Sequence, residues 1–447
     1  MFLGGSGHDP ISGLPTNNYL FSIIIGLDGN HKTSRIFQLQ NRNLYTGYYS
    51  NLVKHQDGFI FGGSILDSTH TKTISYLAKL NSLGDTAWLK EFGPELFSSA
   101  IRGISVCRNG DIIACGNYKA QGQDAKVRLM RFDSTGNLIW EKLHGFSGFN
   151  CDGFSVLEAP DGGFFVGGRT DYGTGWPSDT KPLVLTTDSL GNQPNLIVLP
   201  GGNDFYQMIS HLALSPDGYL ILSGSRSKNI FPYYPSMYLA KADWNGNIIW
   251  DKFIGEGQFQ NPIGPIFCLP GGEIIASGLW NDTTGNSTKF LGRFSPQGDS
   301  IWIQRYSKMN GFSLSEIFDV LKVNADGGFM LCGYGRQDSV AFQDGFIMRV
   351  DSTGSINACF PLGLAGEINE SEFLIYPNPA NDILNFQSKG QRIAEGIIFD
   401  ISGKNLLHIY PGEIQFSIPV SGFSPGIYLY KIILLDGTQR SGKWVKN

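Results

Sequence analysis

The sequence predicts an all-β fold of repeated four-stranded antiparallel sheets, followed by a small second domain, and three observations support this prediction. The chain has 447 residues with 58 Gly, 13% aromatic residues and 16% charged residues, a composition typical of turn-rich β proteins. Two series of glycines recur along the chain with the same period of about 54 residues. This rhythm stops after Cys359, where a different pattern begins.

The repeat has two glycine anchors, one that closes a short apolar run and one in a turn further along. The first anchors are Gly5, Gly63, Gly116, Gly168, Gly224, Gly278 and Gly333. The second anchors are Gly29, Gly84, Gly136, Gly191, Gly246, Gly298 and Gly354. Because units of this length show four strands and no helical period, the sequence predicts a seven-bladed β-propeller with four-stranded blades over residues 1–361.

Residues 211–255 show one unit clearly, with the strands HLALSP, YLILSGS, MYLAKAD and IIWDKFIG. Asp217-Gly218 and the stretch WNGN supply the residues that tight turns need, since Gly tolerates positive φ and Asp or Asn bonds the backbone two residues on. None of the Asp-Gly turns continues with the ligand spacing of a calcium loop, so no metal site is expected. The tryptophans that follow the second turn, at 88, 140, 250 and 302, are predicted to pack between adjacent sheets.

The first unit starts at its second strand, since MFLGGS aligns with FIFGGS at residues 59–64. We therefore predict that the first blade lacks its first strand. We also expect a longer precursor that carries this strand and a secretion signal upstream of Met1.

Composition excludes several classes of function. The formal net charge is −5 and no run of Lys or Arg occurs, so nucleic acid is not expected as a partner. No segment is long and apolar enough to be a transmembrane helix. The six cysteines form no CxxC pair, which gives no zinc or redox signal, and Cys115 and Cys332 occupy a repeat position that favours a small buried side chain.

The stretches MRFDSTGNLIW and AKADWNGNIIW resemble the tryptophan-containing repeats of quinoprotein-like propellers and of related secreted bacterial propellers. The resemblance extends from residue 1 to about residue 360. Quinoprotein dehydrogenases place a vicinal disulfide beneath pyrroloquinoline quinone and usually have eight units. This chain has no adjacent cysteine pair and seven units, so no cofactor is expected.

The C-terminal part has its own motif set. After a linker at 362–372, residues 373–447 carry YPNP, DISGK, GIY and two terminal lysines in a fixed order. These residues resemble the type A C-terminal sorting domain of the type IX secretion system of the Bacteroidetes, which implies a small Ig-like β-sandwich. The matching residues are Tyr376, Pro377, Asn378, Pro379, Asp382, Asp400, Gly403, Lys404, Gly426, Tyr428, Lys443 and Lys446.

That resemblance implies that the C-terminal domain is an export signal. The type IX secretion machinery is then a partner, and the chain is expected to be secreted, extracellular or attached to the outer cell surface. The family also implies cleavage of the sorting domain, often with transfer of the passenger to surface lipopolysaccharide.

Ligand binding is predicted at the rim that carries the long loops, because loops on a rigid scaffold gather binding groups. Aromatic rings there can stack on sugar rings or peptide side chains, while neighbouring polar groups fix orientation; alternatively, they pack their own loops. The candidate ligand-binding residues are Tyr118, Arg169, Tyr172, Trp176, Arg226, Tyr233, Tyr234, Trp280, Tyr334 and Arg336. Phe146 and Phe149 lie in a neighbouring inter-blade loop.

No catalytic motif occurs, since the seven His stand apart from any GxSxG or HExxH pattern. The leading hypothesis is a secreted or surface-attached propeller that binds a glycan or a protein. The alternatives are an extracellular enzyme acting on polysaccharide, with carboxylates such as Asp152 or Glu316 converging on the same rim, and a structural surface component.

Overall fold

The computed structural model describes most of the chain, in twenty segments. These are residues 2–8, 18–25, 31–37, 43–46, 52–66, 72–96, 98–172, 180–200, 207–227, 235–254, 263–281, 287–306, 308–309, 312–322, 327–337, 343–362, 373–388, 390–400, 404–435 and 439–446. Strands and turns make up these segments, and no helix within them is long and apolar enough to cross a membrane.

The chain divides into two compact units, Met1–Leu362 and Gly363–Asn447. The last strand of the first unit, β29, runs to Leu362, so it includes the first residue of the predicted linker. The rest of that linker, residues 363–372, lies outside the described residues.

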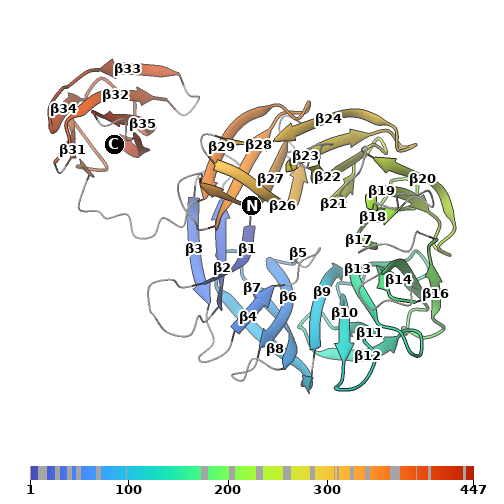
Figure 1. The fold of residues 1–447 in the computed structure, drawn as a ribbon. Coiled ribbons are helices and arrows are strands. Elements are labelled where there is room, and N and C mark those ends of the chain that lie inside the picture. Colours follow the sequence, from blue (N-terminus) through green and yellow to red (C-terminus); the bar gives the residue numbers. More distant parts are fainter. Residues whose placement is uncertain are drawn as a thin grey trace. The chain divides into compact units, whose positions relative to one another are not determined.

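In the described part of the first unit, antiparallel sheets follow one another along the chain, and we number them as blades 1 to 7. Figure 1 shows them arranged around a centre, with the first strand of each sheet inside and the last outside. Blade 1 has three strands, β1 (Phe2–His8), β2 (Asn18–Ile25) and β3 (His31–Phe37). Its sheet therefore starts with the strand that is second in the other blades, as the sequence predicts.

The other blades follow the predicted order of four strands. Blade 2 is β4 (Asn43–Thr46), β5 (Leu52–His55), β6 (Gly58–Leu66), β7 (Thr73–Leu80) and β8 (Thr86–Leu96), where β4 and β5 pair with opposite halves of β6. Blade 3 is β9 (Ser98–Val106), β10 (Ile112–Lys119), β11 (Lys126–Phe132) and β12 (Leu138–His144). Blade 4 is β13 (Cys151–Glu158), β14 (Phe164–Thr170), β15 (Lys181–Thr187) and β16 (Asn195–Val198).

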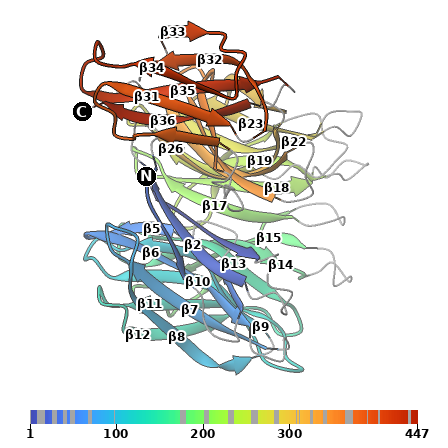
Figure 2. The same ribbon diagram turned by 90° about the vertical axis from the view of Figure 1, so that its left-hand side faces the viewer.

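Blades 5 to 7 repeat the pattern. Blade 5 is β17 (Met208–Leu214), β18 (Leu220–Ser227), β19 (Pro235–Ala242) and β20 (Ile248–Ile254), and blade 6 is β21 (Ile263–Cys268), β22 (Ile274–Asn281), β23 (Ser287–Phe294) and β24 (Ser300–Tyr306). Blade 7 is β26 (Phe312–Lys322), β27 (Phe329–Gln337), β28 (Gln343–Val350) and β29 (Ile356–Leu362), with the short β25 (Lys308–Met309) added to β26. Figure 2 shows the antiparallel neighbours of blade 2 running alongside one another.

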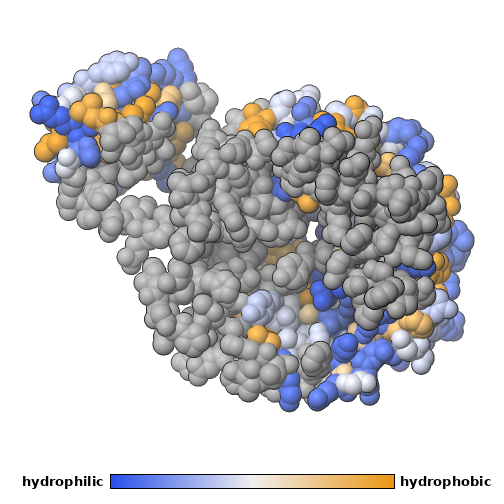
Figure 3. All heavy atoms as spheres, in the orientation of Figure 1, coloured by the Kyte–Doolittle hydropathy of each residue, from blue (hydrophilic) through white to orange (hydrophobic). Residues whose placement is uncertain are grey.

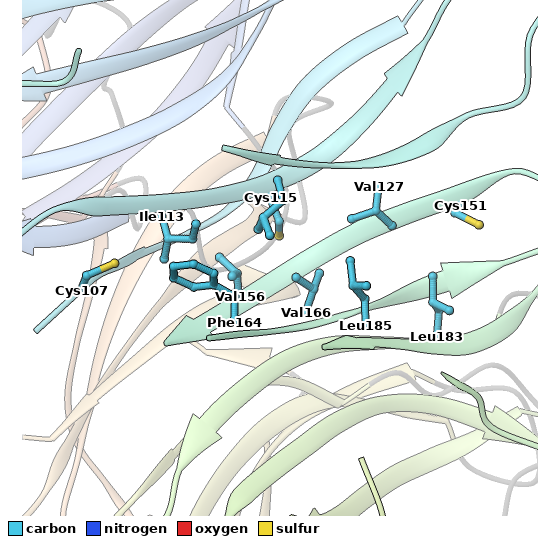
Figure 4. Packing of buried hydrophobic residues seen from close by; sticks show 11 residues of the cluster. Cys107, Ile113, Cys115, Val127, Cys151, Val156, Phe164, Val166, Leu183 and Leu185 are labelled. Carbon is cyan, nitrogen blue, oxygen red and sulfur yellow. The ribbon is translucent and has the colours of Figure 1, made fainter. Parts of the chain in front are cut away.

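The hydrophobic cores of the first unit lie between neighbouring blades. Figure 4 shows one of them, in which Cys115 and Val127 of blade 3 pack with Val166 and Leu185 of blade 4. Equivalent clusters join blades 2 and 3, blades 4 and 5, blades 5 and 6, and blades 6 and 7. Both faces of these sheets are therefore covered, which explains the continuous apolar runs in the second and third strands.

The turns between the third and fourth strands are closed by one Gly and one polar side chain, which is Asp in most blades, Asn81 in blade 2 and Ser295 in blade 6. Asp133 accepts hydrogen bonds from the backbone N–H groups of Thr135 and Asn137, each at 2.9 Å, and Gly136 has a φ of 81°. These hydrogen bonds lower the pKa of Asp133. The Asp-Gly pattern therefore serves the turn, and no group of three metal-ligating side chains occurs among the described residues.

The repeated tryptophans dock onto the next blade, which confirms the predicted packing between sheets. A Cβ atom added to Gly191, in the turn of blade 4, would lie 2.8 Å from Cη2 of Trp140 in blade 3. The same relation joins Trp88 to Gly136, Trp250 to Gly298 and Trp302 to Gly354. Only a residue without a side chain fits between ring and turn, so each glycine has a packing role besides its positive φ.

The outer strands turn their other face to solvent. Ile139, Ile249 and Ile301 each precede a docked Trp, and each is 51% exposed. Alternation along the strand explains both observations, since the Trp faces the next blade and the Ile faces away. Figure 3 shows the result, a largely hydrophilic described outer edge with scattered apolar residues.

The second unit is a two-sheet β-sandwich. One sheet has the order β30 (Phe373–Tyr376), β31 (Ile383–Ser388), β34 (Gln415–Pro419), and the other has the order β33 (Asn405–Ile409), β32 (Ile393–Phe399), β35 (Gly426–Leu434), β36 (Gln439–Lys446). Leu384, Phe386, Ile432 and Trp444 are fully buried between them. This unit has its own core and fits the predicted Ig-like sandwich.

Candidate functional site

The long-loop rim of blades 3 and 4 brings together residues from three separate loops. The crossover between the two blades, residues 145–150, lies beside the β10–β11 loop, because Gly148 N–H donates to Asp124 Oδ2 at 2.8 Å. It also lies beside the loop that follows β14, because Asn150 N–H donates to Asp171 Oδ1 at 2.7 Å. Sequence positions far apart thus form one surface, which we call the 3–4 rim.

An aromatic cluster stands on this rim. The ring of Tyr172 lies 4.4 Å from that of Phe146 and 4.8 Å from that of Phe149, between centroids. Tyr172 is nevertheless 43% exposed, whereas both Phe rings are half-buried. The two Phe rings therefore support a Tyr whose remaining surface is open to solvent.

Asn150 is the polar centre of the 3–4 rim. Its side-chain NH₂ donates to Asp171 Oδ2 at 2.8 Å, and its Oδ1 accepts from Ala125 N–H at 2.9 Å and from Lys119 Nζ at 3.3 Å. These bonds fix the three loops against one another beside the aromatic cluster. The roles of Asn150, Asp171 and Lys119 could not be predicted from the sequence, because an Asn, Asp or Lys in or beside a loop carries no distinguishing pattern.

Arg169 lies on the same rim, where its guanidinium is tied to the scaffold. Its Nε and one terminal NH₂ both lie 3.0 Å from Asp152 Oδ2, and its Cζ lies 5.3 Å from the centroid of the Phe154 ring. Arg102 of β9 lies over the same ring at 5.5 Å. Asp152, a carboxylate that the sequence offered for catalysis, is thus engaged in an ion pair.

Two other predicted binding residues, Tyr118 and Trp280, make contacts within the scaffold. The ring of Tyr118 lies 5.8 Å from the guanidinium of Arg128. Trp280 packs against the core between blades 5 and 6, with the guanidinium of Arg305 4.6 Å from its ring centroid. These positions correspond to the alternative interpretation, in which loop aromatics pack their own blades.

Arg226 is held by its own blade and by the chain that follows blade 4, where the Pro200 carbonyl accepts from its Nε. Its Nη1 lies 2.8 Å from Asp251 Oδ2 and donates to the hydroxyl of Tyr238 at 3.1 Å. Burial raises the pKa of Tyr238 to about 12, so this hydroxyl stays protonated. Arg226 has only 11% of its side chain exposed, which leaves little surface for a ligand.

The remaining predicted ligand-binding residues lie outside the described part. Trp176, Tyr233 and Tyr234 are outside the described residues, and so are the side chains of Tyr334 and Arg336, whose backbone belongs to β27. The same holds for the side chain of Glu316.

Most of the described cysteines of the first unit are buried. Cys107, Cys115 and Cys151 are buried free thiols, Cys332 is also buried, and Cys268 is half-buried and free, while the side chain of Cys359 lies outside the described residues. Burial raises the pKa of Cys107 to about 12 and also raises that of Cys151. In the described residues these thiols act as small apolar side chains.

The sorting-motif residues occupy two kinds of position in the second unit. Tyr428 is 9% exposed within the core, and Asp400 Oδ1 accepts from Lys404 N–H at 3.0 Å to close a turn. Tyr376, Pro377, Asn378 and Pro379 are exposed, with cis peptide bonds before both prolines. Asp382, Lys404, Gly426 and Lys443 are also exposed, Lys446 is half-buried, and Gly403 lies outside the described residues.

These features define an all-β protein, a β-propeller followed by a C-terminal β-sandwich. Residues 374–447 match the family described as a secretion system C-terminal sorting domain. The chain therefore carries a type IX sorting domain and is secreted or placed at the outer surface, with the type IX secretion machinery as a partner.

Solved structures share the fold at low identity. Two mutants of the Synechocystis apocarotenoid oxygenase, Glu150Gln and Trp149Ala, superpose with TM-scores of 0.52 and 0.51 at 12% and 11% identity. In each case 81% of this chain and 89% of that chain are covered. The β-propeller domain of the Trilobed protease from Pyrococcus furiosus has a TM-score of 0.46 at 10% identity, covering 79% of this chain and 92% of that chain. No curated protein matches the sequence.

Proposed function

We propose that the exported propeller binds a glycan at the 3–4 rim, with Tyr172 as the stacking platform. The observation that carries this proposal is that Tyr172 is 43% exposed while two Phe rings support it from the crossover loop. An exposed aromatic ring that neighbouring rings hold in place can stack on the sugar ring of a ligand.

The polar groups beside the ring suit a ligand rich in hydroxyl groups. Asn150, Asp171 and Lys119 offer amide, carboxylate and ammonium groups within one hydrogen-bonded network. Such groups bond sugar hydroxyls and fix the orientation of a saccharide on the ring, as in other binding sites where a few polar groups give specificity.

The test is a glycan-array screen of the full chain, followed by affinity measurements on any hit with two matched variants. Tyr172→Ala is expected to weaken binding at least tenfold, about 1.4 kcal/mol of binding free energy. Tyr219→Ala is the control, because Tyr219 is 39% exposed but lies at the β17–β18 turn, on the rim of the tight turns. Equal affinity of the Tyr172 variant and the parent would refute the site.

The screen also separates the competing functions. Release of reducing sugar from a bound polysaccharide would favour the extracellular enzyme, which needs two carboxylates about 5 to 10 Å apart. Binding to no glycan at all would refute the glycan proposal and leave a protein ligand or a structural surface role.

We further propose that the propeller stays on the cell surface, joined to lipopolysaccharide after the sorting domain is removed. The support is the sorting-domain match at residues 374–447. A chain tagged within the propeller is expected to fractionate with the outer membrane as a diffuse, lipopolysaccharide-shifted band. A sharp band found only in the medium would exclude this attachment.

A further inference from the structure

Arg102 of β9 has no carboxylate partner among the described residues of the first unit. Every other described arginine of blades 3 to 5 has one, in the ion pairs Arg108–Glu158, Arg128–Glu141, Arg131–Asp111, Arg169–Asp152 and Arg226–Asp251. Arg102 is half-buried, so part of its charge is removed from water with no opposite charge beside it. A charge withdrawn from water is unfavourable until an opposite charge pairs with it, which makes Arg102 a candidate for pairing with a ligand.

The Arg102 guanidinium is held in place by two neutral groups. Its Nε donates to Asn117 Oδ1 at 3.4 Å, and Asn117, which is 4% exposed, donates from its own NH₂ to Ser98 Oγ at 2.8 Å. The Cζ of Arg102 lies 5.5 Å from the ring centroid of Phe154, which is buried. One edge and one face of the guanidinium are therefore occupied, while its two terminal NH₂ groups have no partner within the described part of the chain.

A β-bulge accounts for the position of Arg102. Arg102 has no partner in β10, because the pairing shifts by one residue at this point of β9. Phe154 has the same place in β13, the inner strand of the next blade, where the pairing with β14 also shifts. A bulge frees a side chain from the alternation of its strand and can re-aim it towards a functional site. Arg102 thus reaches across the joint to the next blade.

Arg102 lies beside the 3–4 rim. The guanidinium of Arg169, which belongs to that rim, lies 5.3 Å from the same Phe154 ring centroid. Arg169 is followed three residues later by Tyr172, the proposed stacking platform. Asp152 already balances the charge of Arg169, whereas no described carboxylate balances the charge of Arg102. This part of the molecule therefore has one positive charge available to an anionic group of a ligand.

We propose that Arg102 binds a carboxylate of the ligand, so that the glycan taken by the 3–4 rim is an acidic oligosaccharide containing uronic acid. This inference rests on the proposed function and names the class of its ligand. The two free NH₂ groups form a planar fork that matches the two oxygens of a carboxylate in a bidentate pair. A neutral sugar would leave the half-buried charge of Arg102 without a partner. An oligosaccharide can place one of its carboxylates on Arg102 and another of its rings on Tyr172.

The experiment measures the affinity of the full chain for matched pairs of oligosaccharides by isothermal titration calorimetry. The pairs are oligomers of galacturonate, glucuronate and mannuronate, each with the same oligomer after reduction of its carboxyl groups to alcohols. At least one uronate oligomer is expected to bind about tenfold more tightly than its reduced form. Equal affinity within every pair, or binding of neutral glycans alone, would overturn the role of Arg102 and leave glycan binding in place. Binding of no glycan would refute both proposals.

Variants separate the carboxylate contact from stacking. Arg102→Gln is expected to weaken binding of the uronate oligomer about tenfold and to leave the affinity for the reduced oligomer within about twofold, whereas Tyr172→Ala weakens both. Arg102→Lys keeps the charge but not the fork, so it is expected to recover only part of the affinity.

Arg305→Gln is the matched control for the loss of one positive charge. Arg305 of blade 6 is exposed, its guanidinium lies 4.6 Å from the ring centroid of Trp280, and it too has no carboxylate partner among the described residues. Its variant is expected to bind the uronate oligomer within about twofold of the parent. Equal losses in the Arg102 and Arg305 variants, or an equal loss of both oligomers in Arg102→Gln, would refute the carboxylate contact.

Discussion

The docking of Trp140 onto Gly191 predicts that one added methyl group weakens the joint between blades 3 and 4. Gly191 has a φ of 71°, so an alanine there is strained by about 1 to 2 kcal/mol whatever surrounds it. Its Cβ would also lie 2.8 Å from two atoms of the Trp140 ring and 3.0 Å from Lys142 Cγ. Overpacking of this kind adds about 1 to 3 kcal/mol.

Gly218 is the matched control, because it has a φ of 86° and nothing within 4 Å of an added Cβ. Gly218→Ala is therefore expected to lower the unfolding free energy by the backbone strain alone, about 1 to 2 kcal/mol. Gly191→Ala is expected to lower it by about 2 to 5 kcal/mol, and the difference isolates the contact with Trp140.

Urea unfolding of the full chain, followed by far-UV circular dichroism, measures both variants against the parent. A Trp140→Leu background supplies the double-mutant cycle, in which Gly191→Ala should become less costly because the ring is gone. If Gly191→Ala and Gly218→Ala lose equal stability, or the Trp140→Leu background changes nothing, the docking argument is refuted.

Two further predictions concern buried polar groups. Arg128 is fully buried, donates to the hydroxyls of Ser75 and Ser99, and lies 2.9 Å from Glu141 Oε2. Arg128→Met is therefore expected to lower the unfolding free energy, measured in urea, by about 3 to 5 kcal/mol. A decrease below about 1 kcal/mol would contradict this role. Burial lowers the pKa of His211 to about 3. Below about pH 6.5 the His211 side chain binds a proton in the unfolded state but not in the folded state. The unfolding free energy should therefore decrease as the pH falls from 6.5 towards 4.5, by up to about 1.4 kcal/mol per pH unit for this group. His211→Gln should flatten that slope, and an unchanged slope would exclude His211 as its source.

Local features of the fold were predictable because one short stretch of chain determines them. The second glycine anchors Gly84, Gly136, Gly191, Gly246, Gly298 and Gly354 all have positive φ, as tight turns require. The Asp-Gly pairs at 161–162 and 217–218 likewise close turns, with Gly162 and Gly218 at φ values of 88° and 86°. Such residues determine the backbone conformation of a turn within four positions, so the order of strands and turns can be predicted from the sequence alone.

Contacts between blades were less predictable, because they join residues about one repeat apart. Arg128 stands in an apolar third strand, where nothing in the sequence indicates that its guanidinium donates to Ser75 of blade 2, as well as to Ser99 of its own blade. The inner strands also contain irregularities, between Gly153 and Ser155 and between Ile209 and His211, which the alternation of side chains does not reveal. Packing decides these features, and the packing partners lie in different repeats.

The candidate site was likewise predictable only in part from the sequence. Tyr172 and its two Phe neighbours were identified as loop aromatics, and the structure brings them together. Arg226 and Trp280 were identified by the same rule, but they pack within the scaffold. Residue type alone cannot separate the two outcomes, since an aromatic ring or a guanidinium suits a protein interior as well as a ligand.

The rigidity of the 3–4 rim connects the fold to the proposed binding. A ligand that must order its own loop loses part of its binding free energy to conformational entropy, about 0.5 to 1.5 kcal/mol for each immobilised side chain. Here Asn150 is bonded to Asp171, Ala125 and Lys119 in the free protein, and Tyr172 N–H donates to Thr170 Oγ1 at 3.1 Å. The loops are held before a ligand arrives, so even a shallow aromatic surface can bind without a deep pocket. Asn150→Ala should therefore lower the affinity even for a glycan that contacts only Tyr172, because the loss of these hydrogen bonds frees the loops that hold the ring.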